Sequence, residues 1–159
     1  MKKNFRIATM VYLIFLGMML GAVVYAGAVV APVTFGSEKW LGSAVLSRFQ
    51  EGQILTQNFV RLGYGLTAMI LAVFLYEGYR YKMGEHDKVV TSVTLVVLAT
   101  AALFSYYYLP NIVSMQSMGE AATQTDTFAG LHKGSELDVK VLAVAILTLM
   151  VLNMRKACR

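Results

Sequence analysis

The stretch IATMVYLIFLGMMLGAVVYAGAVVAPV, residues 7–33, decides the fold of this chain because it is apolar over almost its whole length. At a rise of about 1.5 Å per residue, a helix of this length crosses a hydrocarbon layer of about 30 Å. Three further apolar runs follow, at residues 59–76, 89–109 and 139–154. The sequence therefore predicts an all-α fold, an integral membrane four-helix bundle. Its single domain covers residues 1–159, with spans at 7–33, 57–78, 88–109 and 137–154.

The composition leaves too little polar surface for a soluble domain of this size. Hydrophobic residues make up 57% of the chain and charged residues only 14%, whereas about 25% charged residues are usual in soluble proteins. The net charge of +5 comes from short basic clusters beside the spans and not from one basic face with interleaved aromatic residues. The expected partner is therefore the lipid bilayer, and no nucleic acid is expected.

Lysine and arginine residues gather in three segments that an even number of spans would bring to one side of the membrane. Positive residues are enriched in cytoplasmic segments, so we expect both the N-terminus and the C-terminus in the cytoplasm of a bacterial inner membrane or a plasma membrane. The other two loops hold most of the acidic residues and are expected to face outward. The basic residues are Lys2, Lys3 and Arg6, then Arg80, Lys82 and Lys88, and finally Arg155, Lys156 and Arg159.

Small residues recur at four-residue spacing in the first span, as in the pairs Gly17 with Gly21 and Gly27 with Ala31. Such spacing lets helix backbones approach closely. The pairs could act within the bundle, or between this chain and a second copy or another membrane protein. A homo-oligomer or a membrane protein partner is therefore one expectation.

A polar cluster is predicted at the outer ends of the second and fourth spans. Gln57, Asn58 and Arg61 open the second span, and Glu136 and Asp138 open the fourth. Because a charge within the bilayer is unfavourable, Arg61 is expected to extend outward or to pair with one of these acids. Two interpretations stay open: an outward-facing site for an anion or a proton relay, or an interfacial anchor with a structural ion pair.

A metal site is a second candidate, because Met115, Met118 and His132 lie in the same outer loop. Thioether and imidazole groups suit Cu(I). Methionine is also a routine packing residue, and one histidine supplies only one strong ligand. Haem between helices usually needs a histidine within a span, which neither histidine here clearly provides. Copper or haem handling through His132 is thus an alternative, not the leading prediction.

The motifs of common enzymes do not occur in this sequence. It has no glycine-rich phosphate loop, no H-E-x-x-H and no nucleophile elbow. Its one cysteine, Cys158, can form no internal disulfide and is expected to be a reduced thiol. An enzyme is therefore not the favoured reading.

Three short motifs suggest a family. The first span ends in Val30-Ala31-Pro32-Val33-Thr34-Phe35, the second is preceded by Leu46-Ser47-Arg48-Phe49, and the last by Phe128-Ala129-Gly130-Leu131-His132-Lys133-Gly134-Ser135. These segments, and the number of spans, resemble the transmembrane protein 205-like domain family of unknown function. The resemblance implies a four-helix membrane protein with Pro32, Phe35, His132 and Ser135 at signature positions. The sequence departs from the family pattern after Ser135, where a common asparagine is missing and Asp138 lies one residue earlier.

More remotely, the architecture is similar to the copper-resistance D membrane domain and to a small haem-dependent protoporphyrinogen oxidase, which is an analogy of fold alone. The leading expectation is a non-enzymatic membrane component or a stress-tolerance factor. Copper or haem handling is the alternative. A small oligomeric transporter comes third because the spans lack the expected charges and glycine- or proline-broken helix pairs.

Overall fold

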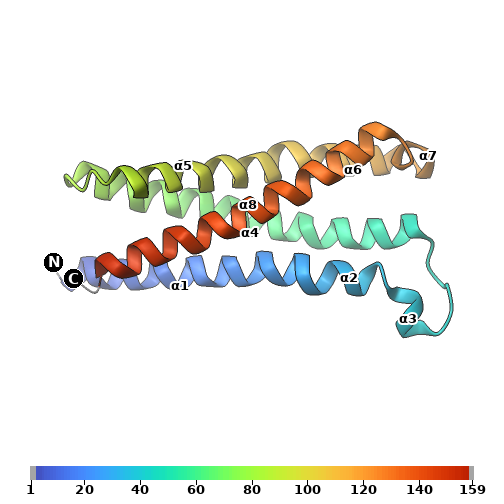
Figure 1. Ribbon diagram of the computed structural model, residues 1–159, viewed down its shortest axis with the longest axis horizontal. Helices are drawn as coiled ribbons and strands as arrows, with labels where there is room; N and C mark the ends of the chain where they lie inside the picture. Colours follow the sequence, from blue (N-terminus) through green and yellow to red (C-terminus); the bar gives the residue numbers. More distant parts are fainter. Residues whose placement is uncertain (1–2, 158–159) are drawn as a thin grey trace.

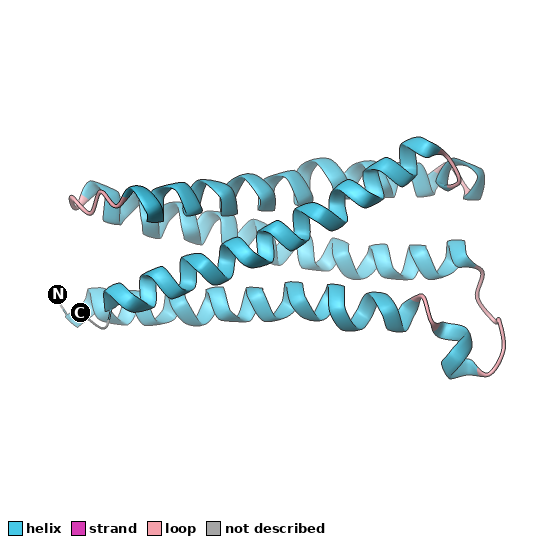
Figure 2. Ribbon diagram, in the orientation of Figure 1, coloured by secondary structure: helices cyan, strands magenta, loops and turns pink. Residues whose placement is uncertain are grey.

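The computed structural model describes residues 3–157, which form helices joined by short loops, with no strand among them (Figures 1 and 2). The helices, with the two π-helical segments labelled η, are α1 (Lys3–Tyr25), η1 (Ala26–Val30), α2 (Ala31–Thr34), α3 (Ser37–Leu41), α4 (Arg48–Lys82), α5 (Lys88–Leu103), η2 (Phe104–Tyr108), α6 (Leu109–Ser117), α7 (Glu120–Thr123) and α8 (Asp126–Ala157). Lys2, Cys158 and Arg159 lie outside the described residues, so the expectations for them stay predictions.

Four continuous helical rods are long and apolar enough to cross a membrane: Phe5–Thr34, Arg48–Lys82, Lys88–Ser117 and Asp126–Ala157. The predicted all-α fold with four membrane helices is therefore confirmed, and the chain is a multi-pass membrane protein. The rods are longer than the predicted spans because polar first and last turns continue the helices beyond the apolar runs. The second rod, for example, begins at Arg48, where Ser47 and Gln50 form a reciprocal capping box.

The start of α1 and the end of α8 lie at one end of the bundle, which we call the terminal end (Figure 1). The opposite end, called the distal end, holds α3, α7 and the loops beside them. At the terminal end α8 lies beside α1, and toward the distal end it crosses away from α2 and approaches α6 (Figure 1). This crossing separates α8 from α2 in the distal half of the molecule.

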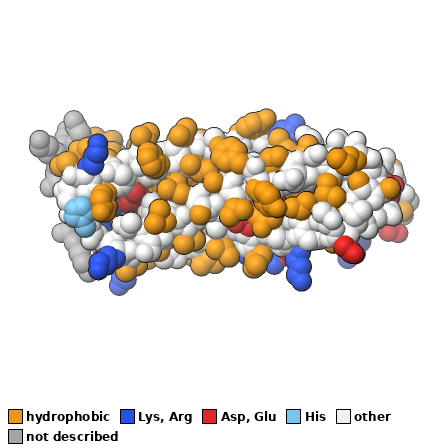
Figure 3. Space-filling model, turned by 90° about the horizontal axis from the view of Figure 1, so that it is seen from above, with side chains coloured by type: hydrophobic (Ala, Val, Ile, Leu, Met, Phe, Trp, Pro, Cys, Tyr) orange, Lys and Arg blue, Asp and Glu red, His pale blue; other side chains and the backbone are white. Residues whose placement is uncertain are grey.

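The core is a seam of apolar side chains spaced three and four residues apart, the repeat that keeps one helix face turned inward. On α4 the seam contains Leu66, Met69 and Val73, and on α8 it contains Leu142 and Ile146, all fully buried. Many other large apolar side chains point away from the bundle and cover its outside (Figure 3). An apolar outside is the surface expected of helices that face lipid.

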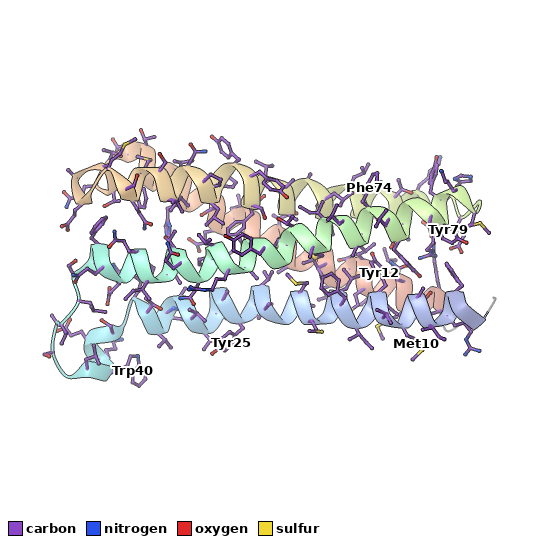
Figure 4. The ribbon with its side chains drawn as sticks, turned by 180° about the vertical axis from the view of Figure 1, so that it is seen from behind. Met10, Tyr12, Tyr25, Trp40, Phe74 and Tyr79 are labelled. Atoms are coloured by element: carbon purple, nitrogen blue, oxygen red, sulfur yellow. The ribbon has the colours of Figure 1, made fainter. Side chains whose placement is uncertain are left out.

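The first rod shows both kinds of position. Tyr12 points into the bundle and is 5% exposed, whereas Met10 and Tyr25 point away from it (Figure 4). The small residues expected to bring backbones together behave unevenly. A Cβ added to Gly65 would lie 3.1 Å from the Met19 methyl group, but one added to Gly21 would meet no described atom within 4 Å. The small-residue spacing therefore marks a close helix contact at some positions and not at others.

Both prolines of the chain follow a π-helical segment. In η1 the Ala31 N–H donates to the Ala26 carbonyl, and in η2 the Leu109 N–H donates to the Phe104 carbonyl. Pro32 and Pro110 then stand at the second position of α2 and α6. Proline lacks an N–H and its ring crowds the carbonyl four residues earlier, so a wider turn before it relieves the clash and lets the helix continue. The third rod accordingly extends beyond the predicted span end at residue 109, as far as Ser117.

Candidate functional site

A cavity of about 830 Å³ lies in the distal half of the bundle, between α1–α2 on one side and α8 on the other. It occupies the region where α8 diverges from α2 (Figure 1). Helices α4 and α6 form its floor. Its volume lies within the range of about 300–1,000 Å³ that is usual for sites that bind small molecules.

The deep part of the cavity is apolar. Phe59 of α4 and Phe104 of η2 meet there edge to face, with ring centroids 5.7 Å apart. Val23 of α1 and Ala143 of α8 complete this region. The phenylalanine pair is held by the core beneath it, since Phe104 is itself buried. The chemistry of this part suits a hydrocarbon chain.

Charged side chains form the rim of the cavity at the distal end. Arg48 donates to the Phe35 carbonyl at 3.0 Å, and its guanidinium lies 4.1 Å from the centre of the Phe35 ring. Arg48 also pairs with Glu51 at 3.3 Å, and Glu51 accepts a hydrogen bond of 2.6 Å from Ser37. These contacts tie the segment after α2 to the start of α4, so the rim is ordered without a ligand.

The remaining charged lining residues belong to α7 and α8. Glu120 of α7 contributes a carboxylate at the distal end. Glu136 and Lys140 follow Ser135 along α8 toward the terminal end, and they pair with each other at 2.6 Å while both side chains stay exposed. The lining thus carries charges of both signs, and those of α8 lie nearer the terminal end than the distal rim does.

Neutral polar side chains lie between the rim and the apolar part. Gln116 of α6 and Thr56 of α4 line the cavity and are 9% and 7% exposed. Within residues 3–157 neither side chain has a hydrogen-bond partner, and neither is among the fully enclosed polar atoms that lack one, so their polar atoms border the cavity. Ser135 of α8 is also buried here, but its hydroxyl donates to the His132 backbone carbonyl at 2.7 Å. Gln116 and Thr56 could not be identified from the sequence, because polar residues are common in loops and at helix starts and nothing in the pattern indicates that these two are buried.

The four signature positions of the family resemblance come together in this cavity. Pro32, Phe35, His132 and Ser135 all line it, although about a hundred residues separate the two pairs in the sequence. The His132 ring stacks on Phe128 with the ring planes 9° apart. The Ser135 hydroxyl is turned to the backbone and not to the imidazole, so the pair does not form a nucleophile and its base.

The structure gives the predicted metal site no support. His132 lines the cavity, but Met115 and Met118 are not among its lining residues, and Met118 is 72% exposed at the end of α6. In the described part of the chain, no three His, Cys, Asp or Glu side chains are arranged to hold a metal ion. A single histidine also offers haem one axial ligand without the buried setting that such a ligand has. The described residues therefore give no support for a copper or haem centre at His132.

The predicted polar cluster is divided. Gln57, Asn58 and Arg61 are exposed on α4, where the Asn58 amide donates to the Ile54 carbonyl and Arg61 to the Gln57 carbonyl. Glu136 pairs with Lys140 on its own helix, as described above. None of the ion pairs within residues 3–157 joins Arg61 to Glu136 or Asp138. Arg61 is exposed instead, which is the first of the two arrangements expected for it.

Asp138 differs from the other members of that cluster. Its Oδ2 atom is buried and has no hydrogen-bond partner among the described residues. Asp138 is not among the residues that line the cavity, whereas its neighbour Val139 is. Asp138 thus belongs to a different face of α8 from the cavity.

A second polar cluster, which the sequence analysis missed, lies inside the terminal end of the bundle. Glu77 of α4 accepts hydrogen bonds from Tyr12 at 3.0 Å and from Asn153 at 2.8 Å. Arg80 donates to Asn153 and Glu85 and lies 3.7 Å from Glu77. Arg80 is 5% exposed, so it is not the surface charge that its place in a basic cluster indicated. Two features of the sequence indicate this cluster: the spacing Glu77-x-x-Arg80, which puts both side chains on one helix face, and an asparagine inside the last apolar run.

The turn between α4 and α5 is joined to the end of α8. Asp87 caps α5 by accepting from the Val89 and Val90 N–H groups, and it pairs with Lys156 at 2.9 Å. The Lys156 ammonium, followed by the Val90 N–H, holds the pKa of Asp87 below its ordinary value of 3.8. The terminal end is therefore closed by polar contacts among α1, α4, α8 and this turn.

The fold and the cavity define the class: a multi-pass membrane protein of four helices with an apolar cavity in the distal half and a polar closure in the other. The sequence model of a family described as a domain of unknown function, DUF4149, matches residues 14–121. That match covers more than half of the chain, and the chain belongs to this family. No curated protein and no solved structure matches the chain.

Proposed function

We propose that this protein is a non-enzymatic membrane component that binds an amphiphilic molecule in the distal cavity. The observation that carries the proposal is the order of the lining: charged residues at the rim, such as Arg48, and phenylalanine side chains in the deep part. An amphiphile has the same order from its polar head to its hydrocarbon chain. Apolar sites with a few placed polar groups are typical of small-molecule binding.

The proposal includes an orientation. Arg6, Arg80, Lys82, Lys88, Arg155 and Lys156 belong to helix ends or turns at the terminal end. The positive-inside tendency favours the cytoplasm for that end of a bacterial inner membrane or a plasma membrane. In this orientation the cavity lies in the outer half of the bilayer, and its ligand reaches it from the outer leaflet or from outside.

The resemblance to the transmembrane protein 205-like domain family supports a membrane component in which Pro32, Phe35, His132 and Ser135 matter for the ligand, because all four line the cavity. Binding is favoured over catalysis because these residues contain no activated nucleophile. A homo-oligomer or another membrane protein partner remains compatible with the exposed small residues of α1, such as Gly21.

A substitution that fills part of the cavity with a side chain tests the proposed binding. A Cβ added to Gly27, which lines the cavity, meets no described atom within 4 Å, so Gly27→Phe places a ring in the empty space without a backbone clash. Purified protein in detergent is titrated with a fluorescent polyene fatty acid as the probe. We expect the affinity of Gly27→Phe to fall at least about tenfold, because the ring occupies the ligand's volume.

Gly21→Phe is the matched control, since Gly21 is equally open but does not line the cavity. It adds the same ring to the same helical rod and should bind the probe as the unmodified protein does. Equal binding by all three proteins would overturn the proposal, because the probe would then attach elsewhere on the apolar surface.

A further inference from the structure

Three layers along α4 give the cavity a chemical order. Arg48 stands at the rim, Thr56 eight residues later, and Phe59 one turn deeper. At about 1.5 Å per residue, Thr56 lies about 12 Å farther along the helix than Arg48. The Gln116 amide lies between them, because a Cβ added to Gly52 would be 3.6 Å from its Nε2 atom. Charge, neutral polar groups and hydrocarbon thus follow one another along α4.

The middle layer holds polar groups without protein partners. Buried polar side chains are normally hydrogen-bonded. Gln116 and Thr56 are each more than nine-tenths buried and line the cavity, and within residues 3–157 no hydrogen bond reaches their side chains. Their polar atoms are not among the fully enclosed ones that lack a partner, so they border the cavity and a ligand can reach them. A threonine in a helix often bonds to its own backbone, as Thr67 does to the Gly63 carbonyl at 3.0 Å. Thr56 keeps its hydroxyl available for another acceptor.

We infer that Gln116 and Thr56 recognise the ester carbonyl of a membrane lipid. This inference rests on the proposed function and names its ligand class. The Gln116 amide and the Thr56 hydroxyl both supply donors, and an ester carbonyl supplies an acceptor with two lone pairs. In an ester-linked lipid this carbonyl stands between the charged headgroup and the hydrocarbon chain. Gln116 and Thr56 occupy the same intermediate place between Arg48 and Phe59.

The charges of the distal rim suit a headgroup that carries both signs. Arg48 is the cation there and Glu120 the anion. Arg48 already pairs with Glu51, and Glu136 and Lys140 farther along α8 pair with each other, so the lining offers little preference for one net charge. The neutral layer is then the part of the site that distinguishes one lipid linkage from another.

The experiment compares two phosphatidylethanolamines with identical chains and headgroup, one diester and one diether. The diether lacks the carbonyl and keeps everything else. The bound fraction of each is measured by native mass spectrometry of the full chain in detergent. We expect the protein to bind the diester about five- to tenfold more tightly, the ratio that about 1–1.4 kcal/mol of hydrogen bonding gives.

The variant that tests the residue is Gln116→Leu, which removes the donor and keeps a similar volume. We expect it to bind both lipids within twofold of each other and to keep its affinity for the diether. Its unfolding midpoint should not fall, because the amide it removes has no protein partner. Thr56→Val should lower the preference in the same direction. If Gln116→Leu does not fold, the unbranched Gln116→Met takes its place.

Gln57→Leu is the matched control, because Gln57 is exposed beside Thr56 and does not line the cavity. It should keep the full preference for the diester. A preference that survives in Gln116→Leu, or that the unmodified protein lacks, would overturn the inference. The proposed function would be untouched by that result, since it stands or falls with Gly27→Phe.

Discussion

The Asn153 side chain connects the buried polar residues that close the terminal end of the bundle. Its amide nitrogen donates to Glu77 at 2.8 Å and to the Leu149 carbonyl at 3.0 Å, and its oxygen accepts from Arg80. It is 1% exposed. Every hydrogen-bonding group of this amide is therefore directed to α4 or to its own helix, and removing it leaves two opposite charges with fewer partners inside the bundle.

Asn153→Leu should lower the free energy of unfolding by about 2–4 kcal/mol, because a buried ionic group that loses a hydrogen-bond partner destabilises the folded protein. Reversible unfolding in a denaturing detergent measures the change. Asn111→Leu is the control, since the exposed Asn111 amide donates only to the Tyr107 carbonyl of its own helix. That variant should stay within about 0.5 kcal/mol of the unmodified protein. Equal losses in both would mean that the closure contributes nothing beyond a helix hydrogen bond.

Helix packing in the distal half depends on the contact of α8 with η2. A Cβ added to Gly134 would lie 2.9 Å from Tyr108 Cε1 and 3.0 Å from its hydroxyl oxygen. Tyr107 lies against the Tyr108 ring, with the centroids 5.1 Å apart. The Tyr108 ring must therefore shift, against a neighbouring aromatic ring, whenever residue 134 carries a side chain.

Gly134→Ala should destabilise the protein by about 1–2 kcal/mol, since overpacking outweighs the gain in helix propensity. Gly130→Ala, one turn earlier on α8, gains the propensity without a contact, because its Cβ meets no described atom within 4 Å. It should raise stability by up to about 1 kcal/mol. The measurement is the thermal unfolding temperature of the two variants. An increase in both would contradict the prediction, because it would show that the Tyr108 ring shifts at little cost.

The membrane helices could be predicted from the sequence, whereas their ends and their contacts could not. Apolar length and charge placement give the four rods directly. Pro110 indicates the end of a helix by its missing N–H, yet η2 lets the third rod continue past it. The reason is that a wider turn upstream relieves the proline clash, and no residue pattern announces such a turn.

The candidate site was predictable only in part. His132 and Ser135 came from a motif and line the cavity, but Gln116 and Thr56 did not stand out. Their significance depends on their place beside the cavity, which only the packing of α4, α6 and α8 reveals. For Arg61 the sequence leaves two arrangements open, outward extension or an ion pair, and the structure shows an exposed side chain with no acidic partner within residues 3–157.

The two ends of the molecule are built differently. The terminal end is closed by buried polar contacts centred on Glu77 and Arg80, whereas the distal half contains the cavity. The proposed ligand site therefore lies in one half of the molecule only. The molecule does not contain, within residues 3–157, the paired broken helices that many transporters use to expose a site alternately.

The orientation of the whole molecule can be tested with single cysteines in a Cys158→Ser background. Ser43 and His86 are exposed loop residues at the distal and terminal ends. With the termini in the cytoplasm, Ser43→Cys should react with a membrane-impermeant maleimide in intact cells, and His86→Cys only after permeabilisation. The reverse pattern would contradict the proposed orientation and place the cavity in the cytoplasmic leaflet.

The two π-helical segments have an effect that reaches beyond their own turns. Each spreads one extra residue over a turn, which rotates every later side chain of its rod by about 100° relative to an uninterrupted α-helix. Phe35 comes after η1 and Gln116 after η2 along the chain, and both residues line the cavity. Losing or gaining one residue there would turn different side chains of α2 and α6 toward the cavity, and it would also rotate the buried Leu109 and Ile112. A change in helical phase alone would thus give a four-helix scaffold of this kind a differently lined cavity.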